Sequence, residues 1–317
     1  MTRIPTVTEL IANRRTGESD DYVLGLALEG GGMRGVVSGS MLIALRDLGA
    51  ENIFDRHYGT SSGAINLAYF YAGQGWDGLS IYYDHLTRGF IRPAAARLTA
   101  PTLNMTYAFD DVMVERVPLD TRALARAPKP IQVVLTDVKA VKAEVVDLRS
   151  CASEAVAYLK ASSWLPLLSG APLKLHQRTY LDGGIVFPDP VYAAMADGCT
   201  HVLILNTASQ GDDSAHSPRS RRILQVTLNN WAAGLGDVYV RSRLRWDADR
   251  ARVGFERETR LDGIRVYRLA PRPNAHKVGR LTTDRAALLD GARAGYETVL
   301  RWLDRDRPAY FSVTTHS

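Results

Sequence analysis

Ser61 lies in a short stretch whose residue types suit a reactive serine, Gly59-Thr60-Ser61-Ser62-Gly63. Glycines two positions on either side of a serine allow the sharp turn that projects a hydroxyl above a sheet. An apolar stretch precedes this turn, and helix-forming residues follow it from Ala64 to Ala68. A GxSxG pattern alone is common, and a plain turn is the simpler interpretation. The position between an expected strand and an expected helix favours Ser61 as a nucleophile.

A glycine-rich stretch precedes this serine by one expected strand-helix-strand unit: Glu29-Gly30-Gly31-Gly32-Met33-Arg34-Gly35. Glycines between a strand and a helix leave backbone N–H groups free at the helix N-terminus, where an anion is favoured. Such a loop could hold a phosphate or an oxyanion. Gly30, Gly32 and Gly35 also satisfy GxGxxG, so a dinucleotide site with Asp47 or Glu51 near the ribose is an alternative, as is a purely structural turn.

A third stretch, Tyr180-Leu181-Asp182-Gly183-Gly184, places a carboxylate before two glycines. Alone it predicts an ordinary turn. A serine hydroxyl is a weak nucleophile at neutral pH and needs a base within hydrogen-bond reach. A carboxylate shielded from water can be that base, because burial raises its proton affinity. Asp182 is therefore the candidate base for Ser61.

Together the three stretches resemble the patatin-like phospholipase family, whose glycine-rich oxyanion loop, serine elbow and Asp-Gly-Gly signature occur in this order. The stretch Ala161-Ser162-Ser163-Trp164-Leu165-Pro166 is similar to the segment that usually leads into the family's aspartate. The similarity extends over about residues 22–206. Each signature is weak alone, and their combination is specific.

This resemblance implies a three-layer α/β/α sandwich with a mostly parallel central sheet. It implies a lipid acyl hydrolase of the phospholipase, lysophospholipase or carboxylesterase type, which works through an acyl-enzyme. Ser61 would attack the ester carbonyl, and Asp182 would take its proton and return it to the leaving alcohol. The resemblance assigns the remaining roles by position: an oxyanion hole of Gly31, Gly32 and Met33, loop support from Gly30, Arg34 and Gly35, and elbow glycines Gly59 and Gly63. Asp189 departs from the family, which commonly has Asn before this proline.

Several alternatives stay open at this stage. An α/β-hydrolase triad of Ser61, Asp182 and His276 has the right chain order, but its oxyanion loop would belong to an earlier part of the sheet. We expect His276 to be a surface residue and His57 to pack against a strand. Acyl transfer to an acceptor other than water would use the same groups. A catalytically silent lipid-binding or scaffold protein is the alternative from a different class.

The hydrophobic pattern predicts an α/β chain. Strands are expected over residues 22–28, 53–58, 131–137, 143–148, 201–206 and 264–269. Helices are expected over residues 37–48, 64–71, 153–159, 230–257 and 283–303, with a polar loop over 209–222. Alternation of strand and helix at the start predicts a parallel sheet covered on both faces.

We expect a polar tail over residues 1–20 and a single hydrolase domain over residues 21–317. Its motif-bearing core would span about 22–206, and a C-terminal helical extension about 223–317. Residues 73–126 have no clean period, and their aromatic residues are candidates to shape an acyl site. The arginines between Arg241 and Arg257 are expected on a solvated helix with ion pairs to Asp247, Asp249 and Glu256.

The chain has 317 residues, 46% hydrophobic composition and a net charge of +5, as expected for a globular protein with a sizeable core. Cys151 and Cys199 lie in no metal-ligand or CxxC pattern, so we expect no cofactor and no metal. The chain lacks a signal-peptide pattern and an apolar run of about 20 residues, so a cytoplasmic location is expected. The expected partner is an acyl lipid or small ester. Peripheral contact with an anionic membrane stays open, and no nucleic-acid binding is expected.

Overall fold

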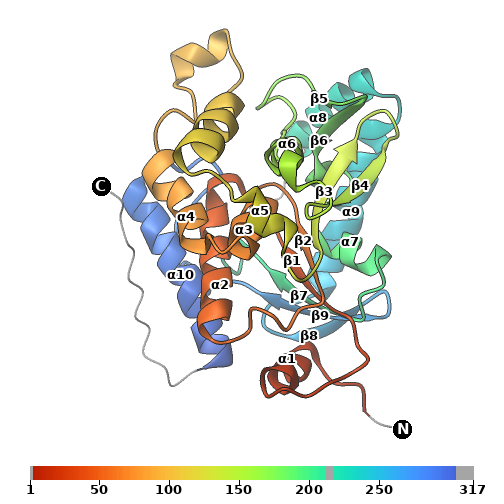
Figure 1. Ribbon diagram of the computed structural model, residues 1–317. Helices are drawn as coiled ribbons and strands as arrows, with labels where there is room; N and C mark the ends of the chain where they lie inside the picture. The colour runs from red at the N-terminus through yellow and green to blue at the C-terminus, as the bar shows by residue number, and fades with distance from the viewer. Residues whose placement is uncertain (1–2, 212–216, 305–317) are drawn as a thin grey trace.

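The centre of the molecule is a β-sheet with helices on both of its faces (Figure 1). The computed structural model describes residues 3–211 and 217–304, and within them the sheet has nine strands. These are β1 (Leu24–Leu28), β2 (Arg56–Gly59), β3 (Ile131–Asp137), β4 (Lys142–Asp147), β5 (Leu173–Leu175), β6 (Arg178–Asp182), β7 (His201–Leu205), β8 (Glu258–Leu261) and β9 (Ile264–Leu269).

The strand order is β5-β6-β3-β2-β1-β7-β9-β8, and β4 pairs with β3 outside this path. The neighbours from β3 to β9 along this order pair in parallel. The strands β4, β5, β6 and β8 pair antiparallel. The prediction of a mostly parallel central sheet in a mixed α/β fold is therefore confirmed.

The α-helices in the described residues are α1 (Val7–Arg15), α2 (Gly35–Asp47), α3 (Ser62–Tyr71), α4 (Gly75–Ser80), α5 (Thr121–Ala125), α6 (Ala155–Ser162), α7 (Val191–Ala196), α8 (Pro218–Trp231), α9 (Leu235–Arg252) and α10 (Arg285–Leu303). Short 3₁₀ segments occur at Gly32–Arg34, Ala94–Leu98, Ala152–Glu154 and Gly183–Ile185. Two segments are π-helical, Ile81–His85 and Tyr107–Arg116.

The buried side chains of β1 alternate between two hydrophobic clusters, as the pleat of a strand requires. Leu26 belongs to the cluster that contains α2, α3 and α10. Ala27, its neighbour, belongs to the cluster that contains Val191 of α7 and Trp246 of α9. Figure 1 shows these helix groups on opposite sides of the sheet. The molecule therefore has three layers, with the sheet in the middle.

The register of the sheet brings the three predicted motifs to one edge. Leu28, the last residue of β1, pairs with Gly59, the last residue of β2. Gly59 pairs with Val133 of β3, and Asp182 at the end of β6 pairs with Leu135, two residues further along β3. The glycine-rich loop, Ser61 and Asp182 therefore follow strand ends at the same level. This edge of an open α/β sheet is where ligands bind.

Two regions differ from the sequence expectation. Residues 1–20 were expected to form a polar tail, but α1 lies within them because Thr6 and Glu9 form a capping box. Its apolar residues Val7, Leu10 and Ile11 have helical spacing and are buried. The polar residues on the other faces of α1 make this helical spacing hard to recognise in the sequence.

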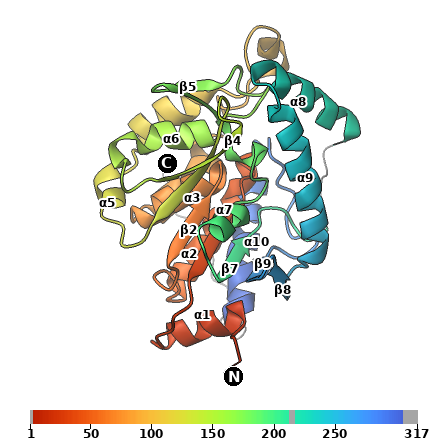
Figure 2. The ribbon, with the colours of Figure 1, turned by 90° about the vertical axis from the view of Figure 1, so that its right-hand side faces the viewer.

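The region after β7 also differs, because one helix was expected over residues 230–257. Instead α8 and α9 form a helical hairpin, and the two helices lie side by side in Figure 2. The chain turns between them at Gly234, whose φ of +84° favours glycine. α8 begins at Pro218, inside the expected polar loop, of which residues 212–216 lie outside the described residues. The expected C-terminal helical extension also contains β8 and β9.

Close packing of α10 against α2 fixes the helix that follows the glycine-rich loop. Gly291 and Gly295 make this approach possible. A Cβ atom built on Gly295 would lie 2.3 Å from the Val37 carbonyl oxygen and 2.3 Å from the Ser40 Oγ atom. Such contacts are far inside van der Waals distance, so the two helix backbones require glycine here.

We predict that Gly295→Ala lowers the free energy of unfolding by about 1–3 kcal/mol, because overpacking separates α10 from α2. In a helix without this contact, the same change would stabilise by about 1 kcal/mol. Urea denaturation measures the effect. Arg293→Ala, at an exposed position of α10, is the matched control and should change stability by no more than about 0.5 kcal/mol. A stabilised Gly295→Ala variant would contradict the packing described here.

Candidate active site

Ser61 occupies the sharp turn between β2 and α3 and has a strained backbone. Its φ is +55° and its ψ is −128°, a conformation that non-glycine residues rarely adopt. The Ser61 N–H donates to the Ser162 hydroxyl at 3.0 Å, and this hydroxyl donates to the Val134 carbonyl at 2.8 Å. The elbow is thus tied to α6 and β3. Ser162 belongs to the stretch over residues 161–166, whose sequence is similar to the segment that leads into the family's aspartate.

The glycines on either side of the serine are needed for close backbone contact. A Cβ atom on Gly63 would lie 2.4 Å from the Leu28 carbonyl oxygen, and one on Gly59 would lie 2.6 Å from the Ala64 nitrogen. Both distances are shorter than any tolerated contact. Glycine at position 63 therefore lets the turn pack against the end of β1, and glycine at position 59 lets β2 turn directly into α3.

Asp182 lies beside Ser61 and is 6% exposed. Its Oδ1 atom accepts the Gly184 N–H at 2.7 Å, and its backbone carbonyl accepts the Thr136 hydroxyl at 2.9 Å. Burial raises the pKa of the Asp182 carboxyl to about 6, although the Gly184 N–H, Arg243 and a side-chain hydrogen bond with Ser61 lower it. The carboxyl therefore titrates just below neutral pH, as a general base should.

The glycine-rich loop runs past Ser61, but two of its predicted oxyanion donors have other acceptors in this conformation. The Gly31 N–H donates to the Ser62 hydroxyl at 2.8 Å, and the Met33 N–H donates to the Arg280 carbonyl at 3.1 Å. Within the described residues, the Gly32 N–H has no hydrogen-bond acceptor. The Met33 N–H is occupied because the loop that contains Arg280 packs onto Gly32 and Met33. The oxyanion role of Gly31, Gly32 and Met33 stays a prediction.

Glu29, at the end of β1, is held by several groups. Its carboxylate accepts hydrogen bonds from Asn206 and from the backbone and hydroxyl of Thr207. Burial alone would raise the pKa of Glu29, but Arg34 lowers it below its usual value. Arg34 is itself buried. Arg34 does not line the polar cavity, and its predicted support of the loop stays a prediction.

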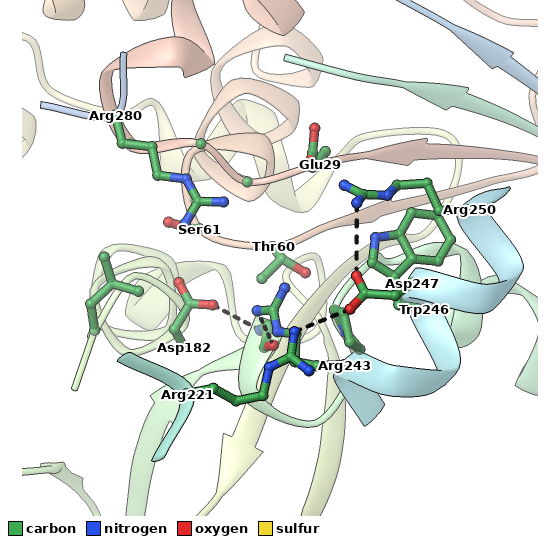
Figure 3. A pocket seen from close by; sticks show the side chains of 16 residues that line it. Glu29, Thr60, Ser61, Asp182, Arg221, Arg243, Trp246, Asp247, Arg250 and Arg280 are labelled. Carbon is green, nitrogen blue, oxygen red and sulfur yellow. Dashed lines mark hydrogen bonds and ion pairs between the residues drawn. The ribbon is translucent and has the colours of Figure 1, made fainter. Parts of the chain in front are cut away.

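Two cavities of opposite character meet at Ser61. The first is polar, and Figure 3 shows Ser61 and Asp182 on its wall together with several arginines. The second is almost entirely apolar and extends from Ser61 into the region of residues 81–113. Gly32, Ser61 and Leu165 line both. A hydroxyl at such a boundary can meet a molecule that has one polar and one apolar end.

The apolar cavity is formed largely by residues 73–126, whose sequence has no clean period. Tyr82, Phe90 and Phe109 line it, as do aliphatic and methionine side chains from the same segment: Ile81, Leu86, Leu103, Met105 and Met113. The hydroxyl of Tyr82 donates to Asn66 of α3, which ties this wall to the elbow. The two π-helical turns explain the missing helical period.

The two histidines of the sequence analysis lie away from the reacting groups. His276 belongs to the loop over residues 271–284 and lines neither cavity at Ser61. His57 is buried in β2, where its ring contacts the Pro130 carbonyl and the Tyr71 hydroxyl. Burial lowers the pKa of His57 to about 4, so this ring stays neutral.

Asp189, the departure from the family pattern, is fully buried. One of its oxygens accepts the Val191 N–H at 2.9 Å, and the other has no hydrogen-bond partner among the described residues. Burial and the nearby Glu29 raise the pKa of Asp189 to about 7. An asparagine could accept the same hydrogen bond. The turn before α7 therefore keeps this bond with aspartate, but aspartate also places an acid in a buried position.

Within residues 3–211 and 217–304, no group of three or more His, Cys, Asp or Glu side chains has the arrangement of a metal site. No helix in the same ranges combines the length and hydrophobicity that crossing a bilayer requires.

Comparison with known proteins places the chain in a family. The model of the patatin-like phospholipase family matches residues 26–195. No curated protein matches the chain. Among solved structures, VipD from Legionella pneumophila is 14% identical with a TM-score of 0.45, over 90% of this chain and 68% of VipD. Human GIVD cytosolic phospholipase A2 is 9% identical with a TM-score of 0.45, over 94% of this chain and 66% of the human one. Because the family model covers more than half of its 317 residues, the chain belongs to the patatin-like phospholipase family.

Proposed function

We propose that this protein is a lipid acyl hydrolase that cleaves acyl esters with Ser61 as nucleophile and Asp182 as base. Membership of the patatin-like phospholipase family supports the lipid acyl hydrolase activity. The single observation that carries the residue assignment is the strained Ser61 turn next to a buried carboxyl with a raised pKa. Strain and a perturbed pKa at one point of a cavity are characteristic of reacting groups.

In the first step, the Ser61 hydroxyl attacks the ester carbonyl carbon while Asp182 accepts the hydroxyl proton. The tetrahedral intermediate collapses, the bond to the alcohol oxygen breaks, and Asp182 returns the proton to that oxygen. The acyl group is then bound to the Ser61 oxygen. In the second step, Asp182 takes a proton from water while the water oxygen attacks the acyl carbon. The bond to the Ser61 oxygen then breaks, Asp182 returns the proton to that oxygen, and the carboxylic acid leaves.

The developing oxyanion lies next to the glycine-rich loop in this proposal. The Gly32 N–H is available to it, whereas the Gly31 and Met33 N–H groups would have to exchange their present acceptors. One N–H donor to an oxyanion is worth about 3 kcal/mol of transition-state stabilisation. A shift of the Arg280 carbonyl away from Met33 would therefore contribute directly to the rate.

The acyl chain fits the apolar cavity, because that cavity begins at Ser61 and is lined by aliphatic and aromatic side chains. Burial of each methylene group of the chain is worth about 0.8 kcal/mol. Acyl transfer to another alcohol would use the same first step. A water molecule is the simplest acceptor, so we propose hydrolysis.

Ser61→Ala should lower kcat/KM for p-nitrophenyl esters by at least about 10³-fold, because the attacking oxygen is removed. A fluorophosphonate probe should label the unmodified protein at Ser61, which peptide mapping by mass spectrometry would locate. Ser150→Ala, at an exposed position on the same molecule, is the control and should keep full activity. Labelling at another residue would contradict the nucleophile assignment.

The ionisation of Asp182 predicts the pH dependence of activity. The base must be ionised, so kcat/KM should fall as pH falls through about 6, the pKa of Asp182. Measuring kcat/KM at about ten pH values between about 4 and 9 gives the pH profile, and its inflection should lie at the pKa of the Asp182 carboxyl. An inflection near 4 would mean that the base is an exposed carboxylate.

The ionised Asp182 carboxylate should also lower the stability of the folded protein at neutral pH. Because its pKa in the folded protein lies above the ordinary value of 3.8, the folded state holds this proton more tightly, and stability falls as pH rises from about 4 to about 6. Asp182→Asn should therefore be nearly inactive but more stable at pH 8, by about 1–3 kcal/mol. Thermal unfolding at pH 8 and pH 4 checks this, with the exposed Asp21→Asn as control. A destabilised variant at pH 8 would contradict the burial cost.

A further inference from the structure

Four arginine side chains converge on the polar cavity next to Ser61 (Figure 3). Arg221 comes from α8, Arg243 and Arg250 come from α9, and Arg280 comes from the loop over residues 271–284. All four lie outside residues 26–195, which match the family model. The C-terminal part of the chain thus adds a positively charged wall to the cavity.

Among the described residues that line the cavity, the carboxylates balance only part of this charge. Asp247 is shared by two arginines, with distances of 3.3 Å to Arg221 and 3.7 Å to Arg250. Asp182 faces Ser61 and, with a pKa of about 6, supplies a second negative charge at neutral pH. The third acid of the lining, Glu29, is held by Asn206 and Thr207 and by charges outside the lining.

Two of the arginines also keep donors without an acceptor. Among the described residues, the buried Nε atoms of Arg221 and Arg243 have no hydrogen-bond partner. Arg243 uses one terminal nitrogen to donate to the Gly184 carbonyl at 2.8 Å. Burial lowers the pKa of Arg243, and the charge of Arg280 lowers it further. An anion in the cavity would relieve the repulsion between Arg243 and Arg280.

The position of Ser61 between the two cavities determines which part of a substrate lies next to the arginines. If the acyl chain occupies the apolar cavity, the ester carbonyl lies at Ser61 and the alcohol extends into the polar cavity. A phosphate monoester has a charge of about −1.5 to −2 at pH 7 and three strong acceptor oxygens, which suits several guanidinium groups at once. A headgroup ending in an ammonium would place a cation against the same wall.

We propose that Arg221, Arg243, Arg250 and Arg280 form a headgroup subsite for a phosphate on the alcohol side of the substrate. The preferred substrates are then acyl esters of phosphorylated alcohols, and zwitterionic and uncharged esters are poorer. This inference rests on the proposed function, because it uses Ser61 as the point of attack.

The first test compares three substrates with the same acyl chain in micelles of an uncharged detergent: 1-acylglycerol 3-phosphate, 1-acylglycerophosphocholine and 1-acylglycerol. The unmodified protein should show a kcat/KM at least about tenfold higher for the phosphate monoester than for either other substrate, as one good charge-assisted contact would give. Hydrolysis of p-nitrophenyl butyrate by the same preparation is measured in parallel.

The second test changes single arginines. Arg280→Gln keeps the backbone carbonyl that accepts the Met33 N–H, and Arg250→Gln keeps a hydrogen-bonding side chain on α9. Each should lower kcat/KM for 1-acylglycerol 3-phosphate about tenfold and bring its ratio to 1-acylglycerol closer to one. Arg241→Gln is the matched control, since Arg241 is an exposed arginine of α9 that lines neither cavity at Ser61. It should keep the preference of the unmodified protein.

The outcomes separate this inference from the proposed function. Hydrolysis of p-nitrophenyl butyrate with equal kcat/KM for the three lipids would overturn the subsite and leave the hydrolase standing. No hydrolysis of any ester would overturn the hydrolase itself. If inorganic phosphate competes with p-nitrophenyl butyrate but the three lipids are cleaved equally, the cavity binds a free anion and the substrate assignment is wrong. A loss of preference in Arg241→Gln as well would mean that overall positive charge, rather than the subsite, selects the substrate.

Discussion

The burial of one carboxyl next to one hydroxyl is the condition on which the rest of the site depends. In the proposed mechanism Asp182 takes a proton from Ser61; in water it would be too weak a base, and burial raises its pKa to about 6. The same burial carries a cost at neutral pH, because an ionised carboxylate is held away from solvent. The Gly184 N–H and the positive charge of Arg243 limit that cost. The surroundings of Asp182 thus balance basicity against stability.

Keeping Ser61 within reach of that carboxyl requires support from several elements. The positive φ of Ser61 is held by the Ser162 hydroxyl, and the turn packs on Leu28 through Gly63. The segment of Ser162 serves the partner residue too, because the Trp164 carbonyl accepts the Asp182 N–H. Residues 162–164, at the end of α6, therefore position both Ser61 and Asp182, which explains why strain at Ser61 can persist.

The sequence predicted those parts that rest on local patterns. The strands β1, β3, β7 and β9 follow from short apolar runs, and the glycines around Ser61 follow from the geometry of a sharp turn. The residue assignments of the site stay predictions, and the tests above address them. What no local pattern revealed depends on contacts between distant segments. The Arg280 carbonyl reaches Met33 across almost 250 residues of chain, as their numbers show, and no spacing rule links the two.

Local sequence patterns also did not reveal which of the arginines between Arg241 and Arg257 line the cavity. Some form the expected ion pairs on α9, such as Arg245 with Asp249 at 3.5 Å. Arg250 pairs with Asp247 at 3.7 Å and also lines the cavity, as Arg243 does, and the hairpin of α8 and α9 brings Arg221 beside them. Arg280 then joins two parts of the site in one residue, because its carbonyl accepts a donor of the glycine-rich loop while its side chain faces the cavity.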